Sequence, residues 1–237
     1  MKKSLFIFIF LILKLTSAQN SIAYCQKYPN HFYKACEWMS ENRELADSII
    51  KGFGLETSAV LAIGLPECGR FSSFSDCVES TSNYYLYSLL GSEYGNFSTG
   101  IFQMKPSFIE NLEKEILRND NLKQFRFCCD YLNSSDLKNI RRQRLSKIQT
   151  SKWQLIYLCA LFTHLDWKYK NKTWISKTDK IKFIASAYNR GFNSEDKEIE
   201  KWINIPYFPN GKIDNYNNYP YGNVAVEFYN YLKSQNL

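Results

Sequence analysis

Residues 153–169 constrain the fold more than any other part of this chain. The segment is apolar on almost every side of a helix, through Leu155, Ile156, Leu158, Ala160, Leu161, Phe162 and Leu165. A helix without a polar face has to be buried among other elements, because no side of it can face water. We therefore expect residues 153–169 to form the central buried helix of a globular domain.

Four further segments have helical patterns, and no segment alternates as a long strand. Thr57 and Ser58 are suited to cap the first, Pro106 begins the second, and Gly191 lies near the C-terminal end of the third. The expected helices are residues 57–66, 106–117, 179–189 and 224–233. The second is expected to turn inward Phe108, Ile109, Leu112, Ile116 and Leu117. Residues 91–100 and 205–222, rich in Gly, Asn, Pro and Tyr, are expected to be loops. The predicted fold class is mainly α, with irregular loops.

The first eighteen residues have the pattern of a secretory signal. Lys2 and Lys3 precede an apolar run that ends at Leu15, and Thr16-Ser17-Ala18 supplies small residues for cleavage after Ala18. The run is shorter than the roughly 20 apolar residues of a membrane span, so an anchor is disfavoured. No later segment is long and apolar enough to cross a bilayer. We expect an exported chain whose residues 19–237 form one domain.

The charge is moderately basic but does not select a partner. Three of the thirty Lys and Arg residues lie in the signal, so the remaining 27 exceed the 23 acidic residues by four. Much of the excess lies in residues 138–147, which contain Arg141, Arg142 and Arg144. Such a run suits an anionic wall glycan, a nucleic acid or a lipid surface, but a solvated helix face is the simpler interpretation. We therefore infer no nucleic-acid partner.

Seven cysteines follow the predicted signal, whereas the whole chain has only two histidines. In an exported protein these cysteines are expected to form up to three disulfides and leave one thiol. Cys25 with Cys36 and Cys68 with Cys77 are pairs close in sequence, although spacing does not fix the connectivity. The absence of a CxxC pair and the scarcity of histidine disfavour a zinc site. No cofactor is predicted.

Glu67 is the strongest candidate for chemistry. It shares a helical face with Val60 and Ile63, and it lies at the expected C-terminal end of the first helix. Partial burial and the negative end of the helix dipole both raise the pKa of a carboxyl group. A raised pKa keeps the group protonated, as a general acid requires near neutral pH. The alternative is a solvated glutamate at a frayed helix end, which position alone favours.

Two later segments carry polar groups suited to a sugar ligand. Gly100 lets backbone approach a ligand closely, and Gln103 offers both a donor and an acceptor before Pro106. Residues 187–191 read Ala-Tyr-Asn-Arg-Gly at the end of an apolar helix. Each segment also has an ordinary structural interpretation, as a glycine-containing loop and as a helix C-terminus.

Taken together and in this order, the three motifs resemble the lytic transglycosylase domain of the lysozyme-like superfamily, which is related to goose-type lysozyme. That family has a catalytic Glu at a helix end, a Gly-x-x-Gln segment leading to a Pro, and an Ala-Tyr-Asn-x-Gly helix end. The matching residues here are Glu67, Gly100, Gln103, Pro106, Ala187, Tyr188, Asn189 and Gly191. The resemblance covers roughly residues 57–191 and implies a lysozyme-like helical domain around a glycan-binding groove.

The resemblance implies an enzyme that cleaves peptidoglycan strands in the periplasm or cell envelope of a bacterium. Glu67 is expected to protonate the linkage between N-acetylmuramic acid and N-acetylglucosamine, and then to act as a base on the muramoyl 6-hydroxyl. The product is a 1,6-anhydro sugar, so a single carboxylate suffices, whereas ordinary glycosidases use two. Gln103 is expected to line the groove, Tyr188 to orient Glu67, and Asn189 to support that loop. Ser98 matches a polar contact to the catalytic carboxyl.

The chain also departs from the family pattern. Cys68 follows Glu67 where a serine is usual, Lys105 stands where many members have methionine, and the stretch from Glu67 to Gly100 is longer than typical. These departures leave open a muramidase that hydrolyses the same linkage, with Asp76 or Glu79 positioning a water molecule.

Two alternatives belong to other functional classes. A cysteine hydrolase built on Cys68, His164 and Asn189 is disfavoured, because Cys68 lies beyond a helix C-terminus and His164 lies within an apolar helix. A glycan-binding module without catalytic activity stays open, because a fold does not fix a function. Oligomeric state cannot be predicted from this sequence.

Overall fold

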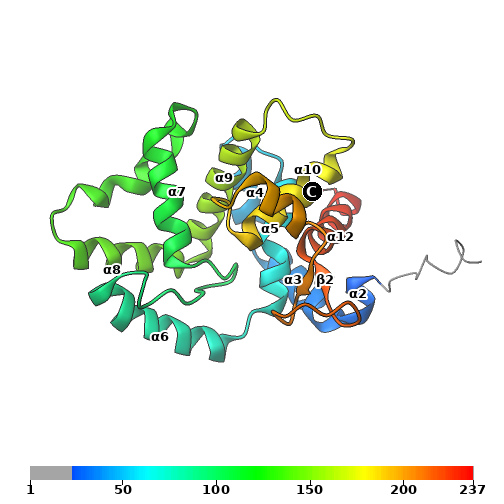
Figure 1. Cartoon of the computed structure of the whole chain (residues 1–237), viewed down its shortest axis with the longest axis horizontal. Coiled ribbons are helices and arrows are strands. Elements are labelled where there is room, and N and C mark those ends of the chain that lie inside the picture. The colour runs from blue at the N-terminus through cyan, green and yellow to red at the C-terminus, as the bar shows by residue number, and fades with distance from the viewer. Residues whose placement is uncertain (1–22, 237) are drawn as a thin grey trace, which may run out of the picture.

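The computed structural model describes residues 23–236 and consists almost entirely of helices (Figure 1), which confirms the mainly α class. The predicted signal, residues 1–18, lies outside the described residues. Across residues 23–236, no helix has the length and apolar character needed to span a membrane. The elements, in chain order, are α2 (Tyr24–Lys27), α3 (Pro29–Glu41), α4 (Arg43–Gly52), α5 (Thr57–Arg70), α6 (Ser73–Leu90), α7 (Pro106–Arg118), the 3₁₀ segment η1 (Asp120–Asn133), α8 (Leu137–Ile148), α9 (Ser151–Lys168), α10 (Lys177–Arg190), α11 (Asp196–Trp202), β1 (Pro206–Phe208), β2 (Tyr219–Pro220) and α12 (Tyr221–Ser234).

Two enclosed helices, α5 and α9, form the centre of the molecule. Figure 1 shows α6, α7 and α8 on one side of them and α10, α12 and the short strands on the other. The prediction of a central buried helix is confirmed by α9, whose residues from Gln154 to Leu165 are buried except Thr163. Every residue of α5 from Thr57 to Gly69 is also buried. All the buried apolar side chains except Tyr131 and Ile140 belong to one connected core.

The first predicted helix was wrong at both ends. Glu56, not Thr57 or Ser58, is the N-cap residue of α5, and no side chain caps this end. The two hydroxyls instead donate to carboxylates, Thr57 to Asp47 (2.5 Å) and Ser58 to Glu56 (2.8 Å). At the other end, α5 continues through Pro66 to Arg70. Packing on all sides holds this helix together despite the N–H that proline lacks.

The other predicted helices are confirmed as α7, α10 and α12, with small changes at their ends. Gly191 ends α10 with φ of 109°, a conformation that favours glycine. Along α7, Ile109, Leu112 and Ile116 are buried as expected, but Leu117 is half exposed. Within the predicted loop 205–222, β1 and β2 form a short antiparallel ribbon.

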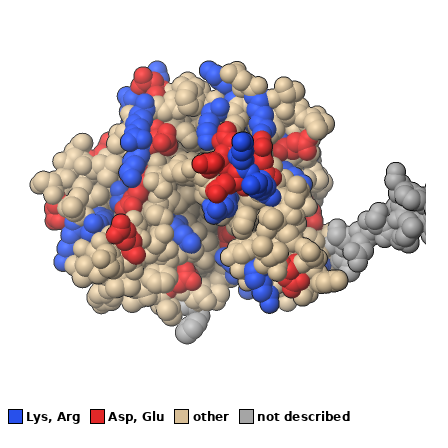
Figure 2. Space-filling model, in the orientation of Figure 1, with Lys and Arg blue, Asp and Glu red and all other residues tan. Residues whose placement is uncertain are grey.

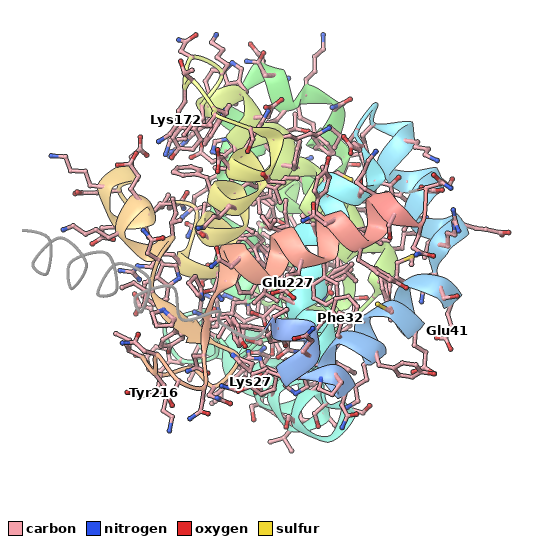
Figure 3. The ribbon with its side chains drawn as sticks, turned by 90° about the vertical axis from the view of Figure 1, so that its right-hand side faces the viewer. Lys27, Phe32, Glu41, Lys172, Tyr216 and Glu227 are labelled. Carbon is pink, nitrogen blue, oxygen red and sulfur yellow. The ribbon has the colours of Figure 1, made fainter. Side chains whose placement is uncertain are left out.

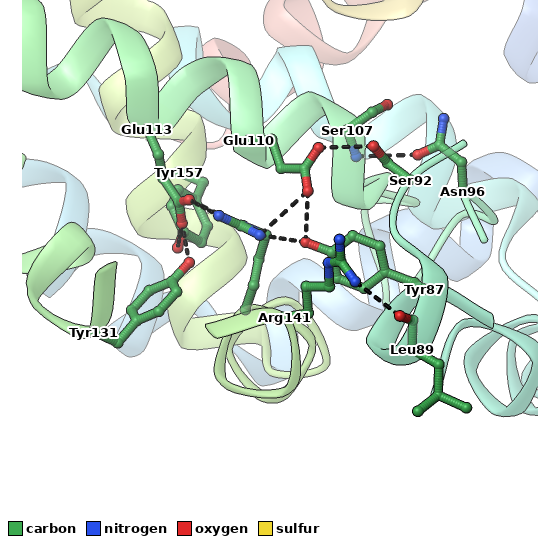
Figure 4. A network of polar contacts seen from close by, with 11 residues as sticks. Tyr87, Leu89, Ser92, Asn96, Ser107, Glu110, Glu113, Tyr131, Arg141 and Tyr157 are labelled. Carbon is green, nitrogen blue, oxygen red and sulfur yellow. Dashed lines mark hydrogen bonds and ion pairs between the residues drawn. The ribbon is translucent and has the colours of Figure 1, made fainter. Parts of the chain in front are cut away.

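The basic run 138–147 forms α8 and is only partly a solvated face. Lys138 and Arg142 are exposed, but Arg144 is buried and donates to Glu113 Oε2 through Nε (2.9 Å) and Nη2 (2.6 Å). The hydroxyls of Tyr157 (3.2 Å) and Tyr131 both donate to the other carboxylate oxygen of Glu113, Oε1 (Figure 4). This paired network joins α7, η1, α8 and α9, so Arg144 has a structural role.

The last helix holds the first described residues against the core. Glu227 of α12 accepts hydrogen bonds from the backbone N–H groups of Tyr24 (2.9 Å) and Cys25 (3.1 Å). Phe32 stacks on Phe228 with ring centroids 4.7 Å apart, and Figure 3 shows α12 crossing beside α2 and α3. These contacts fix the position of Tyr24, which lies near Glu67.

All seven cysteines are among the described residues, and all are free thiols. The expected disulfides are therefore not formed in this structure. For the Cys68–Cys77 pair the reason is local: Cys68 is enclosed within α5, whereas Cys77 is exposed on α6.

Candidate functional site

A cleft of about 540 Å³ opens where α5, α7, α10 and α11 meet the loops before α7 and around β1. Five of the six candidate residues line this cleft: Glu67, Ser98, Gln103, Tyr188 and Asn189. Gly100 does not line it. Three segments that are far apart in the sequence thus contribute to one cavity. Its size is within the usual range for small-molecule sites.

Glu67 lies in the last turn of α5, and its side chain is only 8% exposed. Pro66, immediately before it, has no N–H and disturbs the helical hydrogen bonds there. The buried Tyr221 hydroxyl donates to the carbonyl of Ile63 (2.8 Å), one turn before Glu67. The position of Glu67 on α5 and the hydrogen bond from Tyr221 to this helix together place the carboxyl at the wall of the cleft.

The pKa of Glu67 is raised, mainly because burial disfavours its ionised form. Arg70 Nη2 lies 3.0 Å from Glu67 Oε2, and this cation lowers the pKa, as do Asn189 and Lys105 to a smaller extent. Among residues 23–236, no group donates a well-aligned hydrogen bond to Oε2. A buried carboxyl oxygen with free acceptor capacity is unusual and is often found at functional sites.

Arg70 and Asn189 are themselves held in place. Arg70 Nη1 donates to the carbonyl of Pro209 (3.1 Å) and thereby links α5 to the loop after β1. The side-chain oxygen of Asn189, Oδ1, accepts from Trp202 Nε1 (3.0 Å), which fixes the side-chain amide at the end of α10. Sequence reasoning assigned Asn189 to a supporting role, but it missed Arg70 and Trp202.

Tyr188 is close to Glu67 but does not bind it directly. Its hydroxyl donates to the backbone carbonyl of Phe102 (2.5 Å), so in this structure Tyr188 does not orient Glu67 through a direct hydrogen bond. The negative charge of Glu67 nevertheless contributes to the raised pKa of Tyr188, as it does for Tyr24 and Tyr221. Three buried phenols are therefore close enough to Glu67 to be affected by its charge, and Tyr24 and Tyr221 were not predicted.

Residues 99–104 form a tight loop at the edge of the cleft. Thr99 and Met104 pair through two backbone hydrogen bonds (2.9 and 3.1 Å), and Gln103 has a positive φ of 54°. A positive φ is uncommon outside glycine and asparagine, and such strain gathers at functional sites. The Gln103 side-chain amide donates to the Gly100 carbonyl (2.9 Å), while the residue lines the cleft.

Gly100 supports this loop from behind. Its φ is 72°, and a Cβ atom there would lie 2.2 Å from Gln154 Nε2. Gln154, fully buried in α9, accepts from Phe102 N–H (2.8 Å) and donates to the carbonyls of Thr99 and Ile148 (both 2.6 Å). Gly100 is therefore needed for close packing, not for contact with a ligand.

A second buried amide, Asn83 of α6, was also missed. It donates to the carbonyl of Phe97 (2.6 Å) and the hydroxyl of Thr99 (3.0 Å), and accepts from Phe97 N–H (3.0 Å). Ser98 is thus placed between two anchored residues. The polar contact expected between Ser98 and Glu67 is not formed. The backbone N–H of Ser98 instead donates to Glu79, and this hydrogen bond partly offsets the rise in the pKa of Glu79.

The second carboxylates considered from the sequence lie outside the cleft lining. Asp76 accepts the backbone N–H of Gly100 (2.6 Å). The pKa of Glu79 is raised by partial burial and by the nearby charge of Asp76. Neither residue lines the cleft next to Glu67.

Cys68 and His164 also lie outside the cleft lining. Burial raises the pKa of the Cys68 thiol far above its ordinary value, so a reactive thiolate is disfavoured. His164 is buried with its ring edge against Phe192, and its pKa is lowered by burial. In the part of the chain that the structure describes, no three His, Cys, Asp or Glu residues are grouped as a metal site.

Comparison of the chain with known protein families, curated proteins and solved structures gives no match. The functional inference therefore depends on the residues of the cleft and on their chemistry.

Proposed function

We propose that this protein is an exported, lysozyme-like enzyme that cleaves peptidoglycan strands as a lytic transglycosylase, with Glu67 as its catalytic acid. The observation that carries the proposal is one buried carboxyl with a raised pKa in the wall of a cleft that Ser98, Gln103, Tyr188 and Asn189 also line. Four of these five side chains belong to the three motifs that resemble the lytic transglycosylase domain, and Ser98 lies just before the second motif.

In the proposed reaction, protonated Glu67 donates its proton to the glycosidic oxygen as the bond from that oxygen to muramoyl C1 breaks. The ionised carboxylate then accepts the proton of the muramoyl 6-hydroxyl, whose oxygen bonds to C1. The products are a new 4-hydroxyl end and a 1,6-anhydro end. Glu67 returns to its protonated state, and no water is consumed.

The surroundings of Glu67 suit both steps. Burial favours the protonated form before cleavage, whereas Arg70 and Asn189 stabilise the carboxylate once the proton has left. Asp76 is engaged by the Gly100 N–H, and Glu79 does not line the cleft. Since no second carboxylate among residues 23–236 lines the cleft beside Glu67, one-carboxylate chemistry is favoured over a muramidase with a water nucleophile.

The proposal is tested by zymography on gels that contain purified peptidoglycan. Wild-type protein is expected to clear the gel, and Glu67→Gln is expected to lose clearing while its circular dichroism spectrum stays unchanged. Glu79→Gln is the matched control and is expected to retain clearing. If folded wild-type protein clears nothing but still binds peptidoglycan, the chain is a binding module instead.

A further inference from the structure

The charges that line the cleft are unequal. Among the described residues, its lining includes three cationic side chains, Arg70, Lys105 and Arg190, and a single carboxylate, Glu67. Clefts with one prevailing sign of charge concentrate ligands of the opposite sign. The lining therefore suits a ligand that carries negative charge in addition to polar sugar hydroxyls.

Two of the three cations already have partners. Arg70 pairs with Glu67 and donates to Pro209, and Arg190 Nη2 lies 3.3 Å from Glu198 Oε2. Figure 2 shows blue and red side chains interleaved over α11, where Lys168 and Lys172 also meet Asp196 and Glu200. The charge of Arg190 is thus largely offset within the protein.

Lys105 differs from both arginines. Its side chain is exposed and lines the cleft, and within residues 23–236 it forms no ion pair or hydrogen bond. It is close enough to Glu67 and Glu79 for its charge to lower the pKa of both carboxyls. Lys105 is also the N-cap residue of α7, and the positive end of this helix dipole adds to its field.

We infer that Lys105 is a specificity-determining residue that binds a carboxylate on the glycan, close to the bond that Glu67 cleaves. The inference rests on the proposed function and deepens it. Two sources can supply the carboxylate: the lactyl group of muramic acid in strands stripped of peptide, or an acidic residue of an attached stem peptide. A neutral polymer of N-acetylglucosamine has neither group and is expected to bind without help from Lys105.

Binding is measured with full-length protein that carries Glu67→Gln, so that the fluorescent glycan fragments are not cleaved, at low and high salt. The fragments are peptide-free muramic acid strands, peptide-bearing strands and neutral chitin oligosaccharides. The variants are Lys105→Met, Lys105→Arg and Lys114→Met; Lys114 is an exposed lysine of the same helix that does not line the cleft. Because binding is read directly, the outcome does not depend on cleavage.

Loss of one charge-assisted contact is expected to weaken binding of a carboxylate-bearing fragment by about tenfold in Lys105→Met. Lys105→Arg is expected to retain most of the affinity, while Lys114→Met and all chitin affinities stay unchanged. Sensitivity to peptide-free strands identifies the lactyl carboxylate, and sensitivity to peptide-bearing strands alone identifies the peptide. Equal effects of Lys105→Met on charged and neutral fragments, or no effect on either, would overturn the inference. Absence of cleavage by wild-type protein would instead contradict only the proposed function.

Discussion

The guanidinium of Arg70 lies 3.0 Å from the Glu67 carboxylate, yet the pKa of that carboxyl is raised. Burial outweighs the nearby cation, because the carboxyl is almost fully enclosed whereas 39% of the Arg70 side chain is exposed to water. Glu67 therefore stays protonated at pH values somewhat above its ordinary pKa, and Arg70 limits how far this pKa rises. That balance suits a group that gives up a proton and then takes one back.

Replacement of Arg70 by Met is expected to move the alkaline limb of the pH–rate profile to higher pH. The acid step needs protonated Glu67, so activity falls as pH rises through its pKa. Arg70 lowers that pKa, and its removal raises it further. Peptidoglycan turbidity assays from pH 4 to 9 measure the shift, with Arg118→Met as the control on an exposed arginine. An unmoved or acid-shifted limb would show that Arg70 does not act on Glu67.

Glu67→Gln is expected to stabilise the fold progressively as pH rises. The pKa of Glu67 is higher in the folded chain than in the unfolded chain, so the stability that protonation provides is present at low pH. It is lost as pH rises through the folded-state pKa, above 4.5. Glutamine carries no such penalty. Thermal unfolding of both proteins between pH 4 and 8 tests this, and a melting-temperature difference that does not change with pH contradicts it.

Gly100→Ala is expected to cost far more stability than Gly54→Ala. Both glycines have φ of 72°, but a Cβ at Gly54 meets nothing within 4 Å, whereas one at Gly100 meets Gln154 at 2.2 Å. The conformational penalty alone is about 1 kcal/mol, and we expect Gly100→Ala to cost more than twice that amount. Urea unfolding gives both values. Similar losses in the two variants would mean that the loop is not packed as described.

Gln154→Leu is expected to destabilise the chain by about 3 kcal/mol or more, because it leaves the Phe102 N–H and the Ile148 carbonyl without partners. It also removes one of the two hydrogen bonds to the Thr99 carbonyl, which keeps only the bond from the Met104 N–H. Gln149→Leu, at an exposed position, is the control and is expected to be nearly neutral. Gln154→Leu is also expected to lower activity, because Ser98 and Gln103 lie beside the residues that Gln154 anchors. Full stability in Gln154→Leu would exclude this anchoring role.

The helices with strong apolar patterns were predictable from the sequence, whereas their polar anchors were not. The pattern of residues 153–169 predicted α9, and Gly191 marked the end of α10. The end of α5 was misplaced because proline normally stops a helix, and here burial on all sides outweighs that tendency. Once α5 is extended, Arg70 stands one turn from Glu67, at the spacing of a helical ion pair.

The buried side-chain amides were harder to predict from the sequence than the apolar helices. Gln154 is the one amide residue in the apolar helix α9, and that isolation was the one clue to its role. Asn83 lies in a segment of mixed polarity, and nothing in its local pattern indicated burial. Their partners are backbone groups distant in sequence, so only the folded chain reveals them. The sequence indicated Glu67, Gln103, Tyr188 and Asn189 together, but not which atoms bind which.

Mass spectrometry of the fragments released from peptidoglycan in ¹⁸O-labelled water distinguishes transglycosylation from hydrolysis. Wild-type protein is expected to release 1,6-anhydromuramoyl ends without incorporating ¹⁸O, and folded Glu67→Gln is expected to release no fragments. Reducing ends that carry ¹⁸O would contradict one-carboxylate chemistry, and fragments released by Glu67→Gln at the wild-type rate would contradict the role given to Glu67.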